Sequence, residues 1–179
     1  MAKLIVISGS SGVGKGTVIK EFLNQHKEYR LSISCTTRKP REGEVDGVNY
    51  FYLSVEEFKK SVENNEFLEW AEFSGNYYGT KKSFVEECLN NGENVLLEID
   101  TKGALNVKKL MPEATLIFIA PPSLEELESR LRGRHTETEE AIQKRLASIK
   151  LENENSKYYD HIVVNDTVEN AVECITEFL

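Results

Sequence analysis

The sequence predicts an α/β fold in which helices flank a parallel sheet, with a small strand-rich insertion and an arginine-rich hairpin set into it. Short apolar runs alternate with amphipathic segments at both ends of the chain, as strand–helix–strand units require. Between these ends, residues 34–80 become polar, aromatic and rich in strand signals. The 179 residues suffice for one such domain with a substantial apolar interior.

The first element is a strand over the apolar run Leu4–Ile7, which leads through a glycine-rich loop into an amphipathic helix over 18–26. Glycines allow several backbone N–H groups to converge at a helix N-terminus, where the dipole favours anions. The loop therefore predicts a cradle for nucleotide phosphates, although a turn that only links strand to helix remains the alternative. Its residues are Gly9, Ser10, Ser11, Gly12, Val13, Gly14, Lys15, Gly16 and Thr17.

Lys15 is expected to reach the β- and γ-phosphates. The residue after this lysine is usually Ser or Thr in such loops, but here it is Gly16, and the hydroxyl follows at Thr17. We therefore expect Thr17 to contact a phosphate while a magnesium ion keeps most of its waters, since Mg²⁺ dehydrates reluctantly.

The composition excludes several classes of function. A net charge of −8 argues against a nucleic-acid partner, which usually needs a basic face. The longest apolar run is far below the roughly 20 residues of a membrane helix, and the first strand begins too early for a signal peptide. The scattered cysteines and histidines predict reduced thiols in an intracellular protein and no metal cluster: Cys35, Cys88, Cys174, His26, His135 and His161.

Positive charge is concentrated in two places, which we expect to mark a phosphate site in this acidic chain. The polar loop 35–47 carries Arg38 and Arg41, and a second cluster lies at 130–135. Arginine grips phosphate with a planar two-point fork, although a solvated charged loop is the simpler interpretation of the first cluster alone. Two arginine clusters and one phosphate loop indicate two phosphate groups brought together, and hence phosphoryl transfer.

The middle of the chain predicts an aromatic strand over 48–53, followed by a helix that a capping box at Ser54 begins. Residues 66–73 alternate acidic and apolar side chains, which is typical of a half-buried strand. We interpret the three acids of that strand as solvated, although any one of them could bind a ligand. Residues 75–80 predict a turn, and a second capping box at Ser83 predicts the next helix.

The remaining segments return to the core. The apolar strand 94–100 ends in Asp100, a candidate for the water shell of a metal; a helix N-cap is the alternative role. A buried strand is expected over 115–119, and a long helix capped at 136–139 follows, with Ile142, Leu146 and Ile149 on one face and Arg145 beside them. The last strand is expected over 161–165, with a closing helix after it.

Several of these motifs together resemble the guanylate kinase family, over essentially the whole chain. The segment T-T-R-x-P-R-x-G-E at 36–44 is far more specific than the phosphate loop. The matching residues are Gly9–Thr17, Ser34–Glu44, Tyr50, Glu69–Ala71, Tyr77–Thr80, Glu98–Asp100 and Arg134–Glu140.

The resemblance implies a P-loop kinase core, covering about 1–33, 81–125 and 146–179, with a GMP-binding insertion at about 34–80 and a helical lid at about 126–145. It implies the reaction of ATP with GMP to give ADP and GDP, with magnesium, in purine nucleotide metabolism. We expect a cytoplasmic enzyme with no obligate protein partner, and dGMP as a further acceptor.

The resemblance also implies roles for individual residues. GMP would be held by Ser34, Arg38, Arg41, Tyr50, Glu69, Tyr78, Thr80 and Asp100. ATP would be held by the residues of the loop 9–17 together with Arg130, Arg134 and Asn165. The catalytic residues would be Lys15, Arg38, Arg134 and Arg145, and Thr17 and Asp100 would meet the metal through water.

The chemistry of guanine agrees with these roles. Its N1–H and 2-amino groups are adjacent donors that one carboxylate, such as Glu69, can accept, and Thr80 or Ser34 can donate to O6. Adenine lacks both donors, and a mismatch of buried polar groups can give discrimination on the order of 10⁴. The phosphate oxygen of GMP is already anionic, so alignment and charge neutralisation matter more than a general base. We expect the site to be complete only when the insertion and the hairpin close.

Some residues depart from the family pattern. Ser10, Gly16, Lys102 and His135 replace common residues, but none removes a charge that the reaction needs. Two other classes remain open. One is a protein-binding module that has lost catalysis, which the presence of Lys15 and the arginines disfavours. The other is an adenylate- or uridylate-type kinase, which Glu69 disfavours.

Overall fold

The computed structural model describes residues 2–10, 12–123, 125, 128 and 139–179. They form two compact units, which we describe separately. The first unit contains Met1–Val6 and Lys27–Thr115, and the second contains Ile7–His26 and Leu116–Leu179. The strand β1 (Leu4–Gly9) contributes its first half to one unit and its second half to the other.

The main sheet has the strand order β2-β7-β1-β8-β9. In the first unit, β2 (Tyr29–Ser32) pairs in parallel with β7 (Asn94–Glu98). In the second unit, β8 (Thr115–Ala120) pairs in parallel with β9 (His161–Val164). The predicted parallel sheet flanked by helices is confirmed. Successive apolar side chains are buried along β1, β7 and β8, as is typical of covered parallel strands, whereas the edge strands β2 and β9 keep exposed residues at Arg30, Ile162 and Val164.

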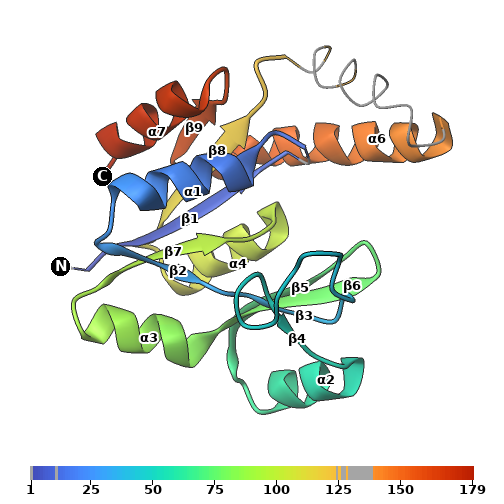
Figure 1. The fold of residues 1–179 in the computed structure, drawn as a ribbon, viewed down its shortest axis with the longest axis vertical. Coiled ribbons are helices and arrows are strands. Elements are labelled where there is room, and N and C mark those ends of the chain that lie inside the picture. The colour runs from blue at the N-terminus through green and yellow to red at the C-terminus, as the bar shows by residue number, and fades with distance from the viewer. Residues whose placement is uncertain (1, 11, 124, 126–127, 129–138) are drawn as a thin grey trace. The chain divides into compact units, whose positions relative to one another are not determined.

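The C-terminal helix of the second unit packs on β9. The helices α1 (Lys15–Gln25) and α7 (Val168–Glu177) lie side by side (Figure 1), with His26 hydrogen-bonded to the hydroxyl of Thr176 at 2.9 Å. The long helix α6 (Glu139–Asn155) runs into the short 3₁₀ turn η1 (Ser156–Tyr158). The predicted apolar face of α6 is present: Ile142 and Ile149 are buried and Leu146 packs against Ile149.

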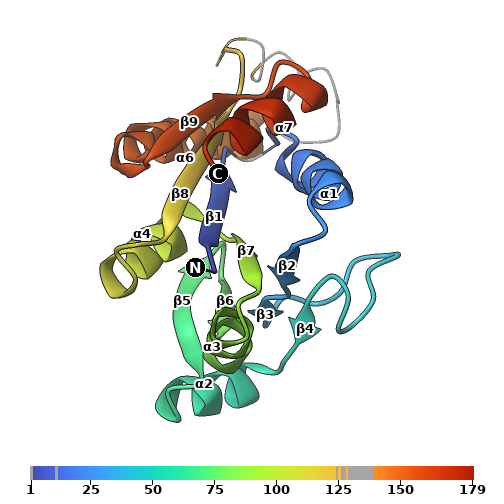
Figure 2. The same cartoon turned by 90° about the vertical axis from the view of Figure 1, so that its left-hand side faces the viewer.

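The first unit contains a second sheet of order β4-β3-β6-β5. Its strands are β3 (Cys35–Thr36), β4 (Phe51–Tyr52), β5 (Phe67–Phe73) and β6 (Asn76–Lys81), and the antiparallel pair β5–β6 lies beside α2 (Val55–Glu63) in Figure 2. The buried ring of Phe58 from α2 stacks on Phe67 and Tyr77. The helix α3 (Lys82–Asn90) packs on β2 and β7, and α4 (Thr101–Leu110) packs on β5.

The capping box predicted at Ser54 is confirmed: its hydroxyl accepts from the Glu57 N–H at 3.2 Å, and the Glu57 carboxylate accepts from the Ser54 N–H at 2.7 Å. The capping box predicted at Ser83 is wrong. The helix α3 begins at Lys82, two residues before the start that a cap at Ser83 would give, and its N-cap Lys81 forms no side-chain cap. The strand β6 runs directly into α3, and this leaves no place for a capping loop.

Two further predictions need correction. Of the segment 75–80 predicted as a turn, only Gly75 lies in the turn, and residues 76–80 belong to β6, because Ser74 and Gly75, both with positive φ, complete the reversal by themselves. The strand predicted over 48–53 is reduced to Phe51–Tyr52, since the preceding loop folds on itself through a bridge between Asp46 and Tyr50.

The three acids assigned to a solvated face do not share one environment. Glu66 and Glu72 are exposed, but Glu69 is buried and the neighbouring Trp70 is 43% exposed. An extra residue in β5, between Phe67 and Glu69 in the pairing with β6, shifts the alternation of side chains. Phe67 and Trp70, three positions apart, consequently both contact Phe58, and Glu69 faces the opposite side.

Within the described ranges, no helix combines the length and the apolar character needed to cross a membrane. Cys35, Cys88 and Cys174 are all free thiols, as the sequence predicts. The predicted lid at 126–145 and the cap expected at 136–139 lie mostly outside the described residues.

Candidate active site

The phosphate loop follows β1 in the second unit. The N–H of Ser10 donates to Ile119 O at 3.4 Å, and the N–H of Val13 donates back to Ser10 O at 3.1 Å. Gly14, with a φ of 88°, is the N-cap of α1 and makes no side-chain cap. A left-handed residue here needs glycine, and a helix start without a side-chain cap is suited to an anion. Lys15 and Thr17 lie in the first turn.

Asn165 holds this loop from the end of β9. Its side-chain amide donates to Val13 O at 2.7 Å, and its backbone N–H donates to Ala120 O at 2.9 Å. The amide nitrogen is also 3.0 Å from where a β-carbon on Gly14 would lie, so Asn165 packs closely against the loop. At the start of the loop, the hydroxyl of Ser10 donates to Asn153 Oδ1 at 3.1 Å. The loop is thus held by two polar side chains from later parts of the chain.

The arginine cluster of the first unit is organised around one carboxylate. The Arg38 Nη2 donates to Glu44 Oε1 at 2.8 Å and to Oε2 at 3.0 Å. The same Oε2 accepts from the Arg41 N–H and from the Tyr52 hydroxyl, each at 2.8 Å. These bonds hold the pKa of the Glu44 carboxyl at about 2, with the Arg38 bond as the largest cause, and raise the pKa of Arg38.

Aromatic side chains surround the guanidinium of Arg38. Its central carbon lies 5.3 Å from the centre of the Tyr50 ring, and Tyr50 meets Tyr78 edge to face at 6.1 Å. Arg41 is exposed on the same loop, and Ser34, 8% exposed, precedes β3. The structure therefore brings together Arg38, Tyr50 and Tyr78, three of the residues assigned to GMP.

The loop that carries these arginines is fastened to β6 by two threonines. The Thr36 hydroxyl donates to Tyr77 O at 3.0 Å and accepts from the Arg38 N–H at 3.1 Å. The Thr37 hydroxyl accepts from the Tyr77 N–H at 2.9 Å. Sequence reasoning assigned these threonines, and Glu44, no role of their own. The motif at 36–44 contained them, but only the folded loop shows that they position Arg38.

A second carboxylate in the first unit is placed very differently. Glu69 is 6% exposed and lies opposite Thr80 in the pairing of β5 with β6. The Thr80 hydroxyl donates to Glu69 Oε1 at 2.8 Å. Burial raises the pKa of Glu69 to about 7; the Thr80 bonds oppose this rise and the nearby charge of Asp100 adds to it. A group with these properties is typical of a functional site.

Asp100 caps α4: its Oδ1 accepts from the Gly103 N–H at 2.7 Å. The N-cap role that the sequence left open is therefore present. The same cap places the carboxylate near Glu69, since the two charges interact. Among the described residues, no group of three or more potential ligands gathers into a metal site.

Several predicted site residues lie outside what the structure describes. Ser11, Arg130 and Arg134 fall outside the described ranges, and so does His135. Arg145 lies within α6, but nothing is described of its side chain. Their roles stay predictions.

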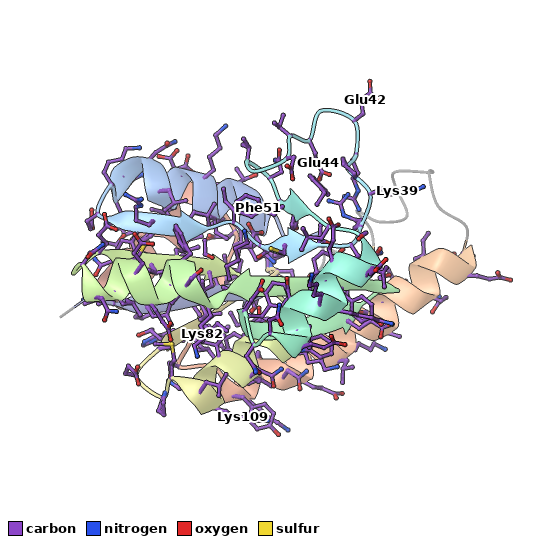
Figure 3. All side chains as sticks on the ribbon, turned by 90° about the horizontal axis from the view of Figure 1, so that it is seen from below. Lys39, Glu42, Glu44, Phe51, Lys82 and Lys109 are labelled. Carbon is purple, nitrogen blue, oxygen red and sulfur yellow. The ribbon has the colours of Figure 1, made fainter. Side chains whose placement is uncertain are left out.

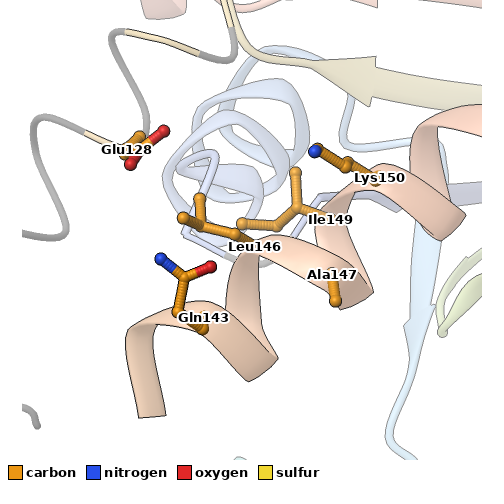
Figure 4. Close-up of a pocket in the computed structure, with 6 residues that line it drawn as sticks. All are labelled: Glu128, Gln143, Leu146, Ala147, Ile149 and Lys150. Atoms are coloured by element: carbon orange, nitrogen blue, oxygen red, sulfur yellow. The ribbon is translucent and has the colours of Figure 1, made fainter. Parts of the chain in front are cut away.

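One hollow of about 230 Å³ lies along α6 (Figure 4). Leu146 and Ile149 form its apolar part, with Glu128 and Lys150 as the charged groups nearby. None of the residues predicted to bind phosphate or base lines it.

The fold and these groups define a class: an α/β nucleotide-binding protein with a phosphate loop. Comparison with known proteins narrows it. The family model for guanylate kinase matches residues 1–179. A guanylate kinase of Bacillus anthracis is 56% identical over 173 residues, covering 96% of this chain and 84% of the relative. One from Prochlorococcus marinus (strain NATL2A) is 48% identical over 179 residues, covering 100% of this chain and 96% of the relative.

A solved structure agrees with these sequence matches. The crystal structure of guanylate kinase from Anaplasma phagocytophilum superimposes with a TM-score of 0.83 and 31% identity, covering 99% of this chain and 84% of that one. The chain belongs to the guanylate kinase family.

Proposed function

We propose that this chain transfers the γ-phosphoryl group of ATP to GMP, giving ADP and GDP, and that dGMP is a further acceptor. The observation that supports this most strongly is the buried carboxylate of Glu69, hydrogen-bonded to Thr80 in a member of the guanylate kinase family. A buried acceptor is costly unless a ligand with matching donors uses it. Guanine supplies two such donors side by side, at N1–H and at the 2-amino group.

The base and the phosphate of GMP use different parts of the first unit. Glu69 accepts from the two donors of guanine while the Thr80 hydroxyl holds that carboxylate in place. Ser34 donates to O6, and Asp100 assists at the 2-amino group. Arg38 and Arg41 hold the phosphate, together with Tyr50 and Tyr78. Support for this division is the network that fixes Arg38 between Glu44 and Tyr50.

The loop at 9–17 is proposed to hold the phosphates of ATP. Lys15 meets the β- and γ-phosphates, and Asn165 keeps the loop in shape through Val13. Arg130, Arg134 and Arg145 complete the charge that stabilises the migrating group, and Lys15, Arg38, Arg134 and Arg145 are the catalytic set. Because the attacking phosphate oxygen is already anionic, these cations act by alignment and by charge neutralisation.

Magnesium accompanies ATP in this proposal and supplies neutralisation of the phosphate charge. Hydroxyl and carboxylate oxygens are the donors that Mg²⁺ prefers, and Thr17, in the first turn of α1, and Asp100 are of that type. Both are proposed to meet the ion through its waters. We place the enzyme in the cytoplasm, in purine nucleotide metabolism and without an obligate protein partner. Residues 34–80 serve as its GMP-binding part and 126–145 as its lid.

The test is a coupled assay of ADP release with ATP and one acceptor at a time: GMP, dGMP, AMP, UMP and dTMP. We expect turnover with GMP and dGMP far above turnover with the others. No turnover with GMP would overturn the proposal, and a preference for AMP or UMP would assign the chain to a different nucleoside monophosphate kinase.

The pKa of Glu69 predicts how GMP affinity depends on pH. Guanine donors need the ionised carboxylate, whereas below a pKa of about 7 Glu69 binds a proton that GMP must displace. The dissociation constant for GMP is therefore expected to fall as pH rises through this pKa and to level off above it. Calorimetric titration of the chain with GMP measures this.

The Glu69→Gln variant is the control for that titration. It binds the same phosphate, so any dependence that comes from ionisation of GMP itself persists in it. A pH dependence equal to that of the unmodified chain would show that Glu69 does not titrate on binding.

A substitution at Glu44 is expected to weaken the use of GMP without affecting that of ATP. Glu44→Gln replaces one accepting oxygen with an amide NH₂, although Arg38, the Arg41 N–H and the Tyr52 hydroxyl all donate to this carboxylate. Hydrogen bonds to charged groups are worth roughly 1.5–3 kcal/mol, so we expect KM for GMP to rise about tenfold or more, with KM for ATP unchanged.

Glu42→Gln provides the matched control, because Glu42 is exposed at the tip of the same loop and points away from it, whereas Glu44 points into the loop (Figure 3). The measurement is KM for GMP and KM for ATP in both variants, from steady-state kinetics. If Glu44→Gln behaves as Glu42→Gln does, the network around Arg38 does not position it for GMP.

A further inference from the structure

The first turn of α4 meets the buried carboxylate of Glu69 at a single residue, Gly103. Gly103 is buried, and α4 packs on β5, the strand that carries Glu69. A β-carbon built on Gly103 would lie 2.5 Å from Glu69 Oε2 and 3.1 Å from Glu69 Cδ. Carbon and oxygen atoms that are not bonded do not approach so closely. The carboxylate can therefore occupy its position only because residue 103 has no side chain.

The backbone conformation does not by itself require glycine at this position. The φ angle of Gly103 is not positive, and the residue lies within a regular helix. Glycine weakens a helix relative to alanine, so helix stability alone would favour alanine at position 103. The other neighbour of the missing β-carbon, Ile99 Cδ1, lies at 3.4 Å, an ordinary contact distance. The requirement for glycine thus comes from the Glu69 carboxylate.

Both oxygens of Glu69 are constrained in consequence. Oε1 accepts from the Thr80 hydroxyl, and Oε2 occupies the space that a β-carbon on Gly103 would need. The same glycine donates its N–H to Asp100 Oδ1 at 2.7 Å. One residue in the first turn of α4 therefore contacts both carboxylates that the proposed function assigns to guanine.

We propose that Gly103 is a positioning residue that determines specificity for the acceptor base, by leaving room for the Glu69 carboxylate at the start of α4. This inference rests on the proposed role of Glu69 in reading guanine. A side chain at residue 103 displaces the end of Glu69, which is a movable group, and leaves the helix intact. Base recognition is affected and the fold is not.

The test is Gly103→Ala, assayed with GMP and AMP as acceptors at saturating ATP. We expect KM for GMP to rise by about tenfold or more and the preference for GMP over AMP to fall, since a displaced carboxylate loses its hydrogen bonds to guanine. KM for ATP should be unchanged, and kcat at saturating GMP should change less than KM. Lys109→Ala, an exposed position in the same helix, is the matched control. A KM for GMP equal to that of the control would overturn the inference.

Two double variants separate the steric contact from a general loss of structure. In the Glu69→Gln background, Gly103→Ala is expected to weaken GMP selectivity no further, because both changes act through one group. In the Glu69→Ala background the space is open, so Gly103→Ala should raise the melting temperature through its better helix propensity. This second readout needs no activity. A lower melting temperature there would show that something other than Glu69 excludes a side chain at residue 103.

Failure of the inference is distinguishable from failure of the proposed function. If the unmodified chain does not phosphorylate GMP, or if Glu69→Gln leaves its acceptor preference unchanged, the proposed function fails. If Glu69→Gln is damaging and Gly103→Ala is not, only the role of Gly103 fails.

Discussion

Replacing Lys15 with Ala is expected to lower kcat for phosphoryl transfer from ATP to GMP by about 10³-fold, the lower end of what a single well-placed cation contributes in such reactions. Lys15 follows Gly14 directly, in the first turn of α1, where the helix start has no side-chain cap. The reaction needs no strong general base, so the loss of a cation from the loop removes a principal source of rate enhancement. We expect the melting temperature to stay close to that of the unmodified chain.

The measurement is the steady-state rate of ADP release at saturating ATP and GMP. Lys20→Ala is the matched control, because Lys20 is an exposed lysine of the same helix. We expect Lys20→Ala to keep its full rate. A near-normal kcat in Lys15→Ala would show that the phosphate loop does not take part in catalysis as proposed.

Replacing Glu69 with Gln is expected to reduce the preference for GMP over AMP by about 10³- to 10⁴-fold, the range that a mismatch of buried polar groups supplies. Gln has the same shape and can still accept from the Thr80 hydroxyl. It presents an NH₂ group where guanine needs an acceptor, so one donor of the base is left unpaired. Adenine lacks these donors and loses no hydrogen bond, so kcat/KM for AMP rises relative to kcat/KM for GMP.

The ratio of kcat/KM for GMP to that for AMP measures this effect. Glu72→Gln is the control, since Glu72 is exposed in the same strand, β5. An unchanged ratio in Glu69→Gln would mean that the base is recognised elsewhere.

The same variant has a stability signature. The pKa of Glu69 is raised to about 7 in the folded chain from an ordinary value of 4.5, so the folded state binds more protons than the unfolded state between these values. The stability that the unmodified chain derives from the neutral carboxyl is therefore lost as pH rises through this window. Glu69→Gln has no such titration. Its melting temperature, relative to that of the unmodified chain, should be higher above this window than below it.

Local patterns were enough to predict much of the fold. The strand β1, the glycine loop and α1 follow one another as the sequence indicates, and the capping box at Ser54 begins α2. These features depend on residues close together in the chain. The resemblance carried by the segment 36–44 supplied the family, which the comparisons confirm.

Features that depend on contacts between distant segments were missed. No local signal marks the role of Glu44, whose partners Arg38 and Tyr52 come into place only when the loop closes. The start of α3 at Lys82 was missed because a strand enters it directly. The burial of Glu69 was missed because three acids spaced three apart were assigned to one solvated face, whereas side chains two apart share a face of a strand. The extra residue in the pairing of β5 with β6 then places Glu69 on the face opposite Phe67.

The extra residue in β5 has a consequence for the register of this strand pair. With regular pairing, Phe67 and Glu69 would share a face, because side chains two apart in a strand point the same way. A slip of β5 by one residue beyond Phe67, with Leu68 opposite Thr80 in place of Glu69, would restore that regularity and turn the Glu69 carboxylate toward Phe58. The orientation of the carboxylate that we propose reads the base therefore depends on the register of two strands as well as on the identity of their residues, and a variant that kept every site residue but shifted this register would present a different surface to its substrate.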